Sequence, residues 1–422
     1  MLDVKENPEQ VERAFLVGVY YPNESEEQTH LLLEELKELL ANLGIETIAM
    51  EAVRIQQPKP KYLIGSGRMA DIIAAAKAEE CDCIIFDNEL SPAQQRNWEH
   101  DSQLCVVDRQ EIILDIFRDR AQTKEASLQV ELARLEYQLP RLKRAWTHLS
   151  RQRGGSSTQR GEGEAQIELD ARMVRDRIAR VKRELKAVVK HRSTQRKQRL
   201  KVPLPTTALV GYTNAGKSSL LNALTQAEVF AADQLFATLD PTTRQLRLPK
   251  GQKLLVTDTV GFVRRLPHRL IEAFKATLEE ARLANFLIHL LDASSPEVKE
   301  HQQTTLDVLK ELEADQKPII TVYNKIDLLT TQERTHLPKG EHICHLSTHT
   351  GEGLKALLEE METVLGAKRI GMELLIPHNR YDLIAKLHQH GQVEHEEALD
   401  EGVAIDASVE KRFSSLFEDF KR

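Results

Sequence analysis

The chain has 422 residues, of which 41% are hydrophobic and 29% are charged, and this composition is typical of an ordinary globular protein with two to four domains. No basic start followed by an apolar stretch is present, and the apolar runs are far shorter than a bilayer, so we expect no secretory signal and no integral membrane segment. The four cysteines form no C-x-x-C pair, which excludes an obvious zinc site or disulfide framework. We expect a cytoplasmic protein, with peripheral membrane association left open.

The net charge of −7 is unevenly distributed along the chain. Between Arg141 and Lys201 there are 19 Lys and Arg against 6 Asp and Glu, a local balance of +13, so the remainder carries −20. A basic block in an acidic protein favours a polyanionic partner, with nucleic acid first. The alternative is a helical face that is merely solvated.

Residues 1–122 predict an α/β N-terminal domain. Strand-like and helix-like stretches alternate, which predicts a mainly parallel sheet with helices on both faces. The turn Gly65-Ser66-Gly67-Arg68 could bind a phosphate, although a simple strand-to-helix turn is favoured. The predicted strands are Phe15–Tyr20, Ile45–Ile55, Cys83–Phe86 and Leu104–Val107, and the predicted helices are Ser25–Leu43, Asp71–Ala78, Ser91–His100 and Glu111–Ala121.

Residues 123–201 predict a basic helical hairpin. Two heptad-patterned stretches flank a loop rich in Gly, Ser and Thr (Gly154–Gly163), which indicates two antiparallel helices about 40 Å long. So narrow an apolar stripe can be buried by the partner helix alone, which leaves the other helix faces for Arg and Lys. The heptad residues are Leu128, Leu132, Leu135, Leu139, Leu142, Trp146 and Leu149, then Ile167, Ala171, Val174, Ile178, Val181, Leu185 and Val188.

Residues 202–367 predict a P-loop nucleotide-binding domain. A strand at Thr206–Val210 and a helix at Ser219–Leu224 enclose a G-x-x-x-x-G-K-S loop. Its backbone N–H groups can bind a polyphosphate at a helix N-terminus; Lys217 would add a positive charge and Ser218 would ligate Mg²⁺. The loop consists of Gly211, Tyr212, Thr213, Asn214, Ala215, Gly216, Lys217 and Ser218.

Three further motifs follow in the order of a G domain. Asp258-Thr259-Val260-Gly261 is a D-x-x-G motif for Mg²⁺ and the γ-phosphate. In Asn324-Lys325-Ile326-Asp327, the Asp327 carboxylate can accept the N1–H and amino group of guanine, so GTP is favoured over ATP. Ser347-Thr348-His349 stands where a base-backing loop belongs.

The segment Phe236-Ala237-Thr238-Leu239-Asp240 lies where a switch would be needed between the loop and Asp258. Thr238 is the predicted second Mg²⁺ ligand, with Thr242 and Thr243 as rivals. Phe262 follows Gly261 where many GTPases carry a Gln that orients water, so slow intrinsic hydrolysis is expected. Another polar group could replace that Gln.

Residues 368–422 predict a small α+β C-terminal domain. Met372–Pro377 and Val403–Ala407 are predicted strands, and Tyr381–Gln389 and Val409–Phe420 are predicted helices.

Over nearly its full length the chain resembles the HflX family of translational GTPases. The resemblance rests on the three G-domain segments at Phe236–Asp240, Asp258–Phe262 and Asn324–Asp327, on Tyr62–Gly67 and Asp87–Pro92, and on the order of domains. It implies GTP hydrolysis with Mg²⁺ held by Ser218 and Thr238, with Lys217, Thr238 and Gly261 as catalytic groups. It also implies binding of GTP and GDP and of the large ribosomal subunit with its RNA, for splitting stalled ribosomes or for biogenesis.

The resemblance also permits weak ATP binding in the N-terminal domain, and a hairpin closed on itself favours a monomer. Two departures from the family pattern stand out. Glu162 replaces a proline in the hairpin loop, and Thr348-His349 replaces an Ala-Lys pair.

Two other functions fit the same features. The hairpin could dock proteins in a GTP-dependent interaction switch, or the chain could be an RNA-binding chaperone with an incidental GTPase activity.

Overall fold

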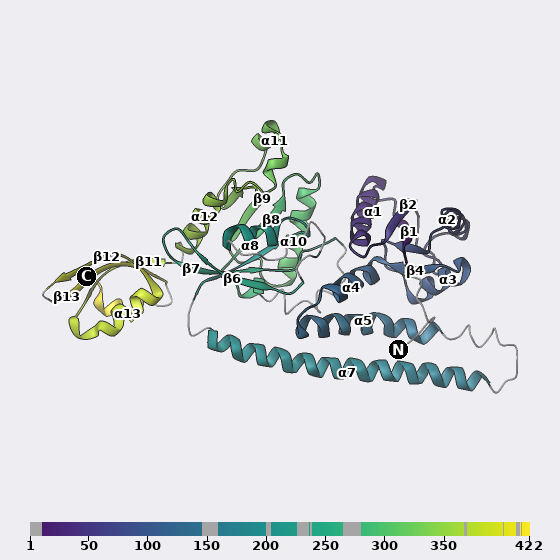
Figure 1. The fold of residues 1–422 in the computed structure, drawn as a ribbon, viewed down its shortest axis with the longest axis horizontal. Coiled ribbons are helices and arrows are strands. Elements are labelled where there is room, and N and C mark those ends of the chain that lie inside the picture. The colour runs from purple at the N-terminus through teal and green to yellow at the C-terminus, as the bar shows by residue number, and fades with distance from the viewer. Residues whose placement is uncertain are drawn as a thin grey trace. The chain divides into compact units, whose positions relative to one another are not determined.

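The computed structural model describes residues 11–145, 159–199, 204–225, 236, 239–264, 280–366, 369–399, 401–410, 414 and 416–422. The chain divides into two compact units, each described by itself below (Figure 1). The first contains Met1–Ser193, Ala231–Asp240 and Val260–Leu278, and the second contains Thr194–Phe230, Pro241–Thr259 and Glu279–Arg422. Both are α/β structures, so the predicted fold class is confirmed.

The first unit contains a four-stranded parallel sheet in the order β2-β1-β3-β4. Helices α2 and α3 share a core with one face, which includes Phe15, Val17 and Trp98, and α1 contacts α4. The predicted parallel sheet is confirmed. The elements are β1 (Arg13–Tyr20), α1 (Glu26–Ala41), β2 (Glu46–Arg54), α2 (Ser66–Ala78), β3 (Cys83–Phe86), α3 (Pro92–Ser102), β4 (Cys105–Asp108) and α4 (Arg109–Arg120).

Helix α2 begins earlier than the sequence predicted. Gly65 is its N-cap, without a side-chain hydrogen bond, and Ser66 is its first residue. Arg68 therefore lies in the first turn of a helix, where its guanidinium pairs with Glu51 at 2.6 Å. The start of the helix was not predicted, because this turn contains no apolar residue that would show a helical period.

Helices α5 (Lys124–Ala145) and α7 (Gln159–Arg199) form the predicted hairpin. Two ion pairs join them, Arg177–Glu131 at 2.6 Å and Lys182–Glu136 at 2.7 Å. On α7, Ala171 and Val181 are buried, as the heptad pattern predicted.

Two expectations about this hairpin were wrong. The helix α7 begins at Gln159, so the second half of the expected Gly154–Gly163 loop is helical, while residues 146–158 lie outside the described part. The helix α5 also packs against α3 and α4, because it carries a second buried stripe that includes Val130, Ala133 and Tyr137. Arginine and lysine side chains are therefore displayed mainly by α7.

The second unit contains a six-stranded sheet in the order β10-β9-β8-β5-β7-β6, with β6 antiparallel to β7 and the other pairs parallel. Helices α8 and α12 share one core with the sheet, and α10 contacts β5 and β8. The elements are β5 (Thr206–Gly211), α8 (Lys217–Thr225), β6 (Thr242–Arg247), β7 (Lys253–Asp258), β8 (Phe286–Asp292), α10 (Val298–Glu311), β9 (Ile319–Asn324), η1 (Ile326–Leu328), α11 (Thr331–Thr335), β10 (Ile343–His345) and α12 (Leu354–Gly366).

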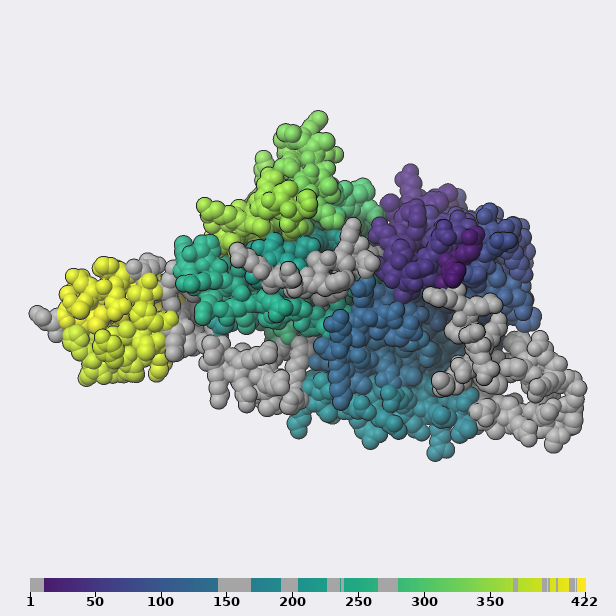
Figure 2. Space-filling view, in the orientation of Figure 1, coloured from purple at the N-terminus to yellow at the C-terminus, as the bar shows by residue number. Residues whose placement is uncertain are grey.

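The C-terminal part of this unit has a core of its own, formed by an antiparallel sheet in the order β11-β13-β12 and by α13. It appears in yellow in Figure 2. The predicted helix Val409–Phe420 is wrong: Val409 lies in β13, and a short η4 (Glu418–Phe420) follows. The other elements are β11 (Arg369–Ile376), η2 (His378–Arg380), α13 (Tyr381–His390), β12 (Gly391–Leu399) and β13 (Gly402–Glu410).

The strand β12 was not predicted, because this acid-rich edge strand has too few apolar residues to show a two-residue period. None of the described helices combines the length and hydropathy needed to span a bilayer.

Candidate functional site

The predicted nucleotide motifs of the second unit meet at one edge of its sheet. Strands β5, β7, β9 and β10 are mutually parallel in the sheet order, so their carboxyl ends lie at the same edge. The phosphate loop follows β5, Asp258 ends β7, Asn324 ends β9, and Ser347 comes shortly after β10. Ligands bind at such an edge in open α/β sheets.

The glycines of the phosphate loop are required by space as well as by backbone conformation. A Cβ on Gly211 would lie 2.3 Å from the carbonyl oxygen of Leu290, and one on Gly216 would lie 2.3 Å from Nδ2 of Asn324. Gly216 also has φ of +94°. Any side chain here would displace the loop from β8 or from the base-binding motif.

Lys217 is held inside the loop. Its Nζ donates hydrogen bonds to the carbonyl oxygens of Gly211 at 3.1 Å and Tyr212 at 2.7 Å. Burial lowers the pKa of Lys217 to about 8, although the nearby Asp258 carboxylate opposes the shift. The ammonium group is therefore poised to gain stability from a polyphosphate.

Ser218 and Asp258 form the hydroxyl–carboxylate pair expected beside a divalent cation. The Ser218 hydroxyl donates a hydrogen bond to Oδ2 of Asp258 at 2.6 Å, and Asp258 is fully buried. The neighbouring Thr259 is tied to β5, because its hydroxyl donates to the Leu209 carbonyl at 2.6 Å. The D-x-x-G start is thereby fixed next to the phosphate loop.

Asn324 links the phosphate loop to the base-backing loop. Its Nδ2 donates to the Ala215 carbonyl at 2.8 Å, and its Oδ1 accepts from the backbone N–H of Thr348 at 3.1 Å. The substitution of Thr348 for the usual alanine leaves this backbone contact in place. Three separate motifs thus share one buried amide.

Asp327 has the electrostatics of a charged acceptor. A hydrogen bond from the Ser347 side chain lowers its pKa most, and His349 contributes a smaller lowering. The His349 ring lies 4.0 Å from the Asp327 carboxylate. Lys325 is held by an ion pair with Asp292 at 2.7 Å, a partner that the sequence analysis did not identify although it ends the preceding strand.

Two histidines of this unit, His301 and His289, were not predicted from the sequence. The ring of Tyr212 stacks on His301 of α10, with centroids 3.8 Å apart and planes 12° apart. His289 on β8 is fully buried, and among the described residues neither of its ring nitrogens has a hydrogen-bond partner. Burial, with the charge of Lys217 adding to it, lowers the pKa of His289 to about 3.

The remaining predicted residues belong to the first unit, lie in β6 of the second unit or lie outside the described part. Phe236, Leu239, Val260 and Phe262 are buried, and Gly261 lies between the last two. Ala237 and Thr238 lie outside the described residues. The rival residues Thr242 and Thr243 lie in β6, where the Thr243 hydroxyl is 2.9 Å from that of Thr257.

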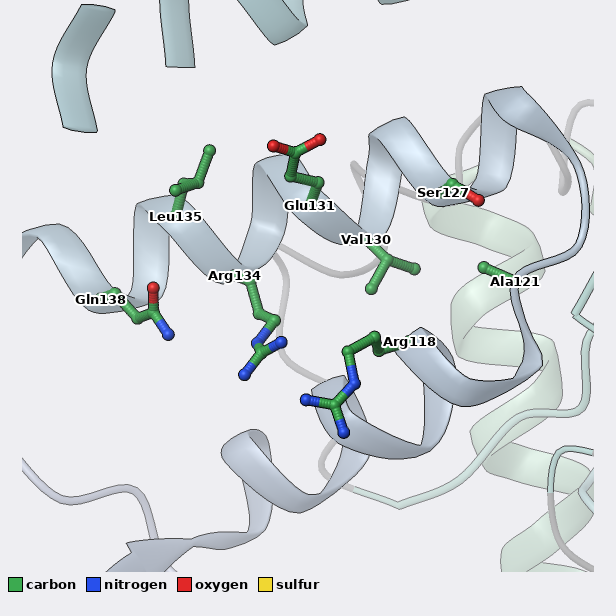
Figure 3. Close-up of a pocket in the computed structure, with 8 residues that line it drawn as sticks. All are labelled: Arg118, Ala121, Ser127, Val130, Glu131, Arg134, Leu135 and Gln138. Carbon is green, nitrogen blue, oxygen red and sulfur yellow. The ribbon is translucent and has the colours of Figure 1, made fainter. Parts of the chain in front are cut away.

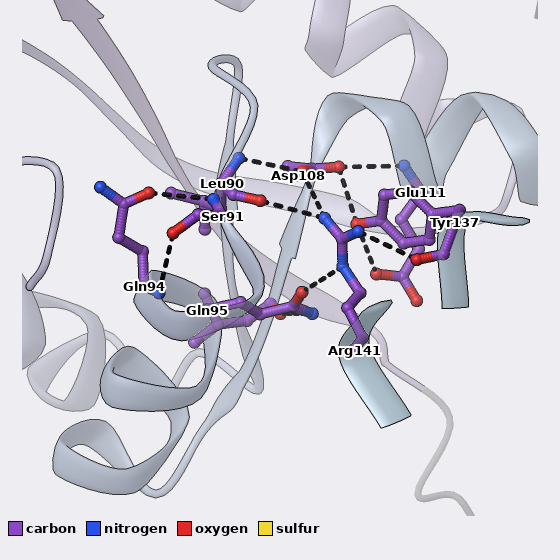
Figure 4. Close-up of polar contacts among 9 residues, drawn as sticks. Leu90, Ser91, Gln94, Gln95, Asp108, Glu111, Tyr137 and Arg141 are labelled. Carbon is purple, nitrogen blue, oxygen red and sulfur yellow. Dashed lines mark hydrogen bonds and ion pairs between the residues drawn. The ribbon is translucent and has the colours of Figure 1, made fainter. Parts of the chain in front are cut away.

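The first unit also contains a buried polar network that fastens α5 to the N-terminal sheet (Figure 4). Arg141 donates to Oε1 of Gln95 at 2.8 Å, to the Leu90 carbonyl at 3.0 Å and to Oδ2 of Asp108 at 3.3 Å. The Tyr137 hydroxyl donates to Oδ1 of Asp108 at 3.0 Å. Burial, with Asp108 next, raises the pKa of Glu111 to about 7.

A hollow of about 410 Å³ lies beside the turn from α4 to α5 (Figure 3). Arg118 and Arg134 line one side, and each lies 3.4 Å from Asp115. Asp119 lies 3.1 Å from Arg118 as well. Because these two carboxylates balance the two guanidinium groups, the hollow has no net preference for an anion. Its lining residues are Arg118, Ala121, Ser127, Val130, Glu131, Arg134, Leu135 and Gln138.

Comparison with protein families covers most of the chain. Residues 31–118 match a family described as "GTP-binding GTPase N-terminal", residues 120–199 one described as "GTP-binding GTPase Middle Region", and residues 206–325 one described as "50S ribosome-binding GTPase".

Individual relatives cover the whole length. The chain is 47% identical over 433 residues to the GTPase HflX of Akkermansia muciniphila, covering 100% of this chain and 99% of the relative. It is 41% identical over 395 residues to the GTPase HflX of Escherichia coli, covering 93% and 92%. Among solved structures, a GTP-binding protein from Sulfolobus solfataricus in complex with GDP is 23% identical, with a TM-score of 0.44 and coverage of 84% and 98%. The chain therefore belongs to the HflX family of GTPases and is a GTP-binding GTP hydrolase.

Proposed function

We propose that this GTPase binds the large ribosomal subunit and uses GTP binding and hydrolysis to remodel ribosomes, either by splitting stalled ribosomes or in their biogenesis. The observation that carries the proposal is the charge of α7. Between residues 168 and 190 this helix has eight Lys and Arg against four Asp and Glu. Its described part forms a teal surface in Figure 2.

The arrangement of α7 favours RNA over a protein partner. Its apolar seam is used by the hairpin itself, since Ala171 and Val181 are buried, and exposed Arg172, Arg180 and Lys186 lie on the remaining faces. Basic side chains along a helix are the electrostatic footprint of a nucleic-acid-binding protein. The matched family described as "50S ribosome-binding GTPase" agrees with a ribosomal source of that RNA.

At the nucleotide site we assign a role to each motif. The phosphate-loop N–H groups and Lys217 stabilise the charge that develops on the phosphates, and Asp327 selects guanine. The backbone N–H of Gly261 would sense the γ-phosphate. Oxygen atoms are the ligands that Mg²⁺ prefers, and the Ser218–Asp258 pair at 2.6 Å places two such side chains together. We assign Ser218 and Thr238 as the residues that would hold Mg²⁺. When bound, the ion would neutralise phosphate charge.

Phe262 explains why turnover would await the ribosome. Its side chain is fully buried and apolar, so it does not orient a water molecule. Phosphoryl transfer depends almost wholly on positioning and charge stabilisation. We expect binding of the large subunit to position the groups that orient the attacking water molecule.

The decisive experiment measures GTP turnover with and without purified large subunits, together with co-sedimentation in GDP and in a non-hydrolysable GTP analogue. Stimulated turnover and nucleotide-dependent co-sedimentation are expected. Equal rates of GTP hydrolysis with and without subunits would contradict the proposal that the ribosome activates turnover. Binding that resists high salt would favour the protein-interaction switch, and equal affinity for free RNA would favour the RNA chaperone.

We also propose the four-part division at 1–122, 123–201, 202–367 and 368–422 as the functional organisation. In it the hairpin binds RNA, the G domain reads the nucleotide, and the protein acts in the cytoplasm as a monomer.

A further inference from the structure

Two of the four cysteines are direct neighbours in the sheet of the first unit. Cys83 on β3 and Cys105 on β4 are paired in register in this parallel pair of strands, and both are free thiols. Neighbouring strands lie about 4.8 Å apart, and disulfides join residues whose Cα atoms are about 4.4–6.8 Å apart. The spacing of the two strands therefore suits a disulfide between this pair.

The two thiols share the sheet face opposite the core that α2 and α3 cover. Ile84 and Val106, which follow the two cysteines and are also paired in register, lie in that core with Trp98. Successive side chains of a strand point to opposite faces, so Cys83 and Cys105 both point to the other face. Cys83 is 1% exposed, whereas Cys105 is exposed on β4, an edge strand.

The pKa of Cys83 reports an interaction between the two side chains. A hydrogen bond with the Cys105 side chain, followed by burial, raises this pKa well above its ordinary value of 9.0, and the charges of Glu111 and Glu99 add to the rise. Thiolates, not thiols, are the nucleophiles in disulfide exchange. Cys83 is therefore a slow first nucleophile, whereas Cys105 can be reached from solvent and has a second sulfur beside it.

The other two cysteines differ from this pair. Cys81 is buried in the core that α2 and α3 share with the sheet. Cys344 is buried in the core of the second unit, where its register partner is Val322 of β9. Both are therefore internal references, because they are buried thiols of the same protein that belong to other cores.

We propose that Cys83 and Cys105 form a reversible oxidation site for a low-molecular-weight disulfide, with Cys105 as the attacking cysteine and Cys83 as the resolving cysteine. An exposed thiol beside a second thiol is the arrangement that redox-sensing proteins use. The site belongs to the first unit and uses none of the nucleotide-binding residues.

The exchange proceeds in two steps. The Cys105 thiolate attacks one sulfur of the small disulfide, whose S–S bond breaks, so that a mixed disulfide forms at Cys105 and one small thiolate leaves. The Cys83 thiol then loses its proton to water, and its sulfur attacks Sγ of Cys105. The mixed disulfide breaks and a second small thiolate leaves. Two protein thiols are thus oxidised to one disulfide, and one small disulfide is reduced to two thiols.

The new bond would connect an edge strand to the interior of the sheet. It closes a covalent loop that contains all of α3 and links β4 to β3, the strand with which β4 pairs. β4 ends at Asp108, which accepts hydrogen bonds from Tyr137 and Arg141 of α5. Because a cross-link restricts the opening of the segment that it closes, oxidation should slow amide exchange in β4.

The test uses the full-length protein, which is reduced, freed of reductant and incubated with oxidised glutathione at pH 8. The remaining thiols are alkylated under denaturing conditions before proteolysis and mass spectrometry. Cys83 and Cys105 should be recovered in one linked peptide, Cys344 should be alkylated, and dithiothreitol should restore both thiols. The backbone amides of β4 should exchange with deuterium about fivefold more slowly in the oxidised protein than in the reduced protein.

Three variants separate the two roles. Cys105→Ala removes the attacking thiol, so Cys83 should stay reduced. Cys83→Ala removes the resolving thiol, so the reaction should stop with glutathione attached to Cys105. Cys81→Ala is the matched control: it removes the buried thiol two residues before Cys83 and should form the linked peptide as the parent does.

Three results would overturn the proposal. They are alkylation of both Cys83 and Cys105 in the treated parent, a mixed disulfide at Cys105 of the parent that never resolves, and equally fast loss of the Cys83 thiol in Cys105→Ala. Cys105→Ala changes an exposed position, so this comparison decides the matter even where the buried Cys83→Ala substitution prevents folding.

Discussion

Lys217 is the residue at which nucleotide binding and proton binding are most directly linked. Its pKa is lowered to about 8 by burial, and bound phosphates stabilise its ammonium form and raise that pKa. Binding therefore takes up a proton at pH values above about 8. We expect the affinity for GDP to be constant between pH 6.5 and 7.5 and to fall by up to about tenfold per pH unit above 8.

Isothermal titration calorimetry can test this linkage. At pH 8.5 the binding enthalpy of GDP should change between buffers with different ionisation enthalpies, and at pH 7.0 it should not. Binding without proton uptake at pH 8.5 would show that Lys217 is already fully charged in the free protein.

His289 makes the second unit sensitive to acid. Its pKa is about 3 in the folded protein, against 6.5 for an ordinary histidine, so between these values the unfolded chain binds more protons. Stability should therefore fall as pH drops below about 6.5, by about 2 kcal/mol at pH 5. His289→Leu removes the titrating group, together with two buried nitrogens that have no partner among the described residues, and should flatten this pH dependence.

Urea unfolding of the full-length protein at pH 7.5 and pH 5 would measure the effect, with the relevant transition identified as the one that GDP shifts upward. An equal loss of stability on acidification in parent and His289→Leu would assign the acid sensitivity to other groups. His301→Gln, on α10, is a suitable control for loss of a histidine near the phosphate loop.

At the scale of the element, the buried network between α5 and the N-terminal sheet includes a carboxyl group that opposes folding at neutral pH. The pKa of Glu111 is raised from 4.5 to about 7, so the folded state binds more protons between these values. The stabilising contribution is complete below about pH 4.5 and is lost as pH rises through 7. Glu111→Gln, a neutral replacement, should stabilise the first unit at pH 8 by about 1–3 kcal/mol and have little effect at pH 4.5.

Arg141 provides the opposing variant. Its guanidinium compensates the buried Asp108, so Arg141→Met should destabilise the protein by about 3 kcal/mol because it leaves that carboxylate without its charged partner. Amide exchange of α5, which reports local stability, would measure both variants. A stabilising Arg141→Met or a neutral Glu111→Gln at pH 8 would show that the network tolerates loss of its charges.

The elements also show what the sequence could reveal. Phosphate-loop, D-x-x-G and N-K-x-D residues were located because each follows an apolar strand, and parallel strands end at a common edge. The stack of Tyr212 on His301 and the bonds from Thr123 to Asp240 were not predicted, since they join residues 89 and 117 positions apart with no periodic pattern between them. The strand β12 was missed for a different reason, because its charged residues carry no two-residue apolar rhythm.

At the scale of the whole molecule, the separation of charge along the chain predicts which part would bind RNA under the proposed function. The basic block lies in residues 141–201, and the rest of the chain is acidic. RNA should therefore be bound through the hairpin and repelled elsewhere. Affinity should depend steeply on salt, because each phosphate contact releases counterions.

The exposed basic side chains of α7 are the groups through which RNA would be bound. Replacing exposed Arg172, Arg180 and Lys186 by Gln should weaken co-sedimentation with large subunits by tenfold or more and reduce the slope of log affinity against log salt by about one for each lost contact. GDP affinity should not change. The matched control replaces Lys299, Lys310 and Lys355, which are also exposed and lie on α10 and α12, by Gln. It should leave the slope of log affinity against log salt unaltered. An unchanged slope in the α7 variant would show that this helix does not contact phosphates, because a lost apolar contact lowers affinity at every salt concentration alike.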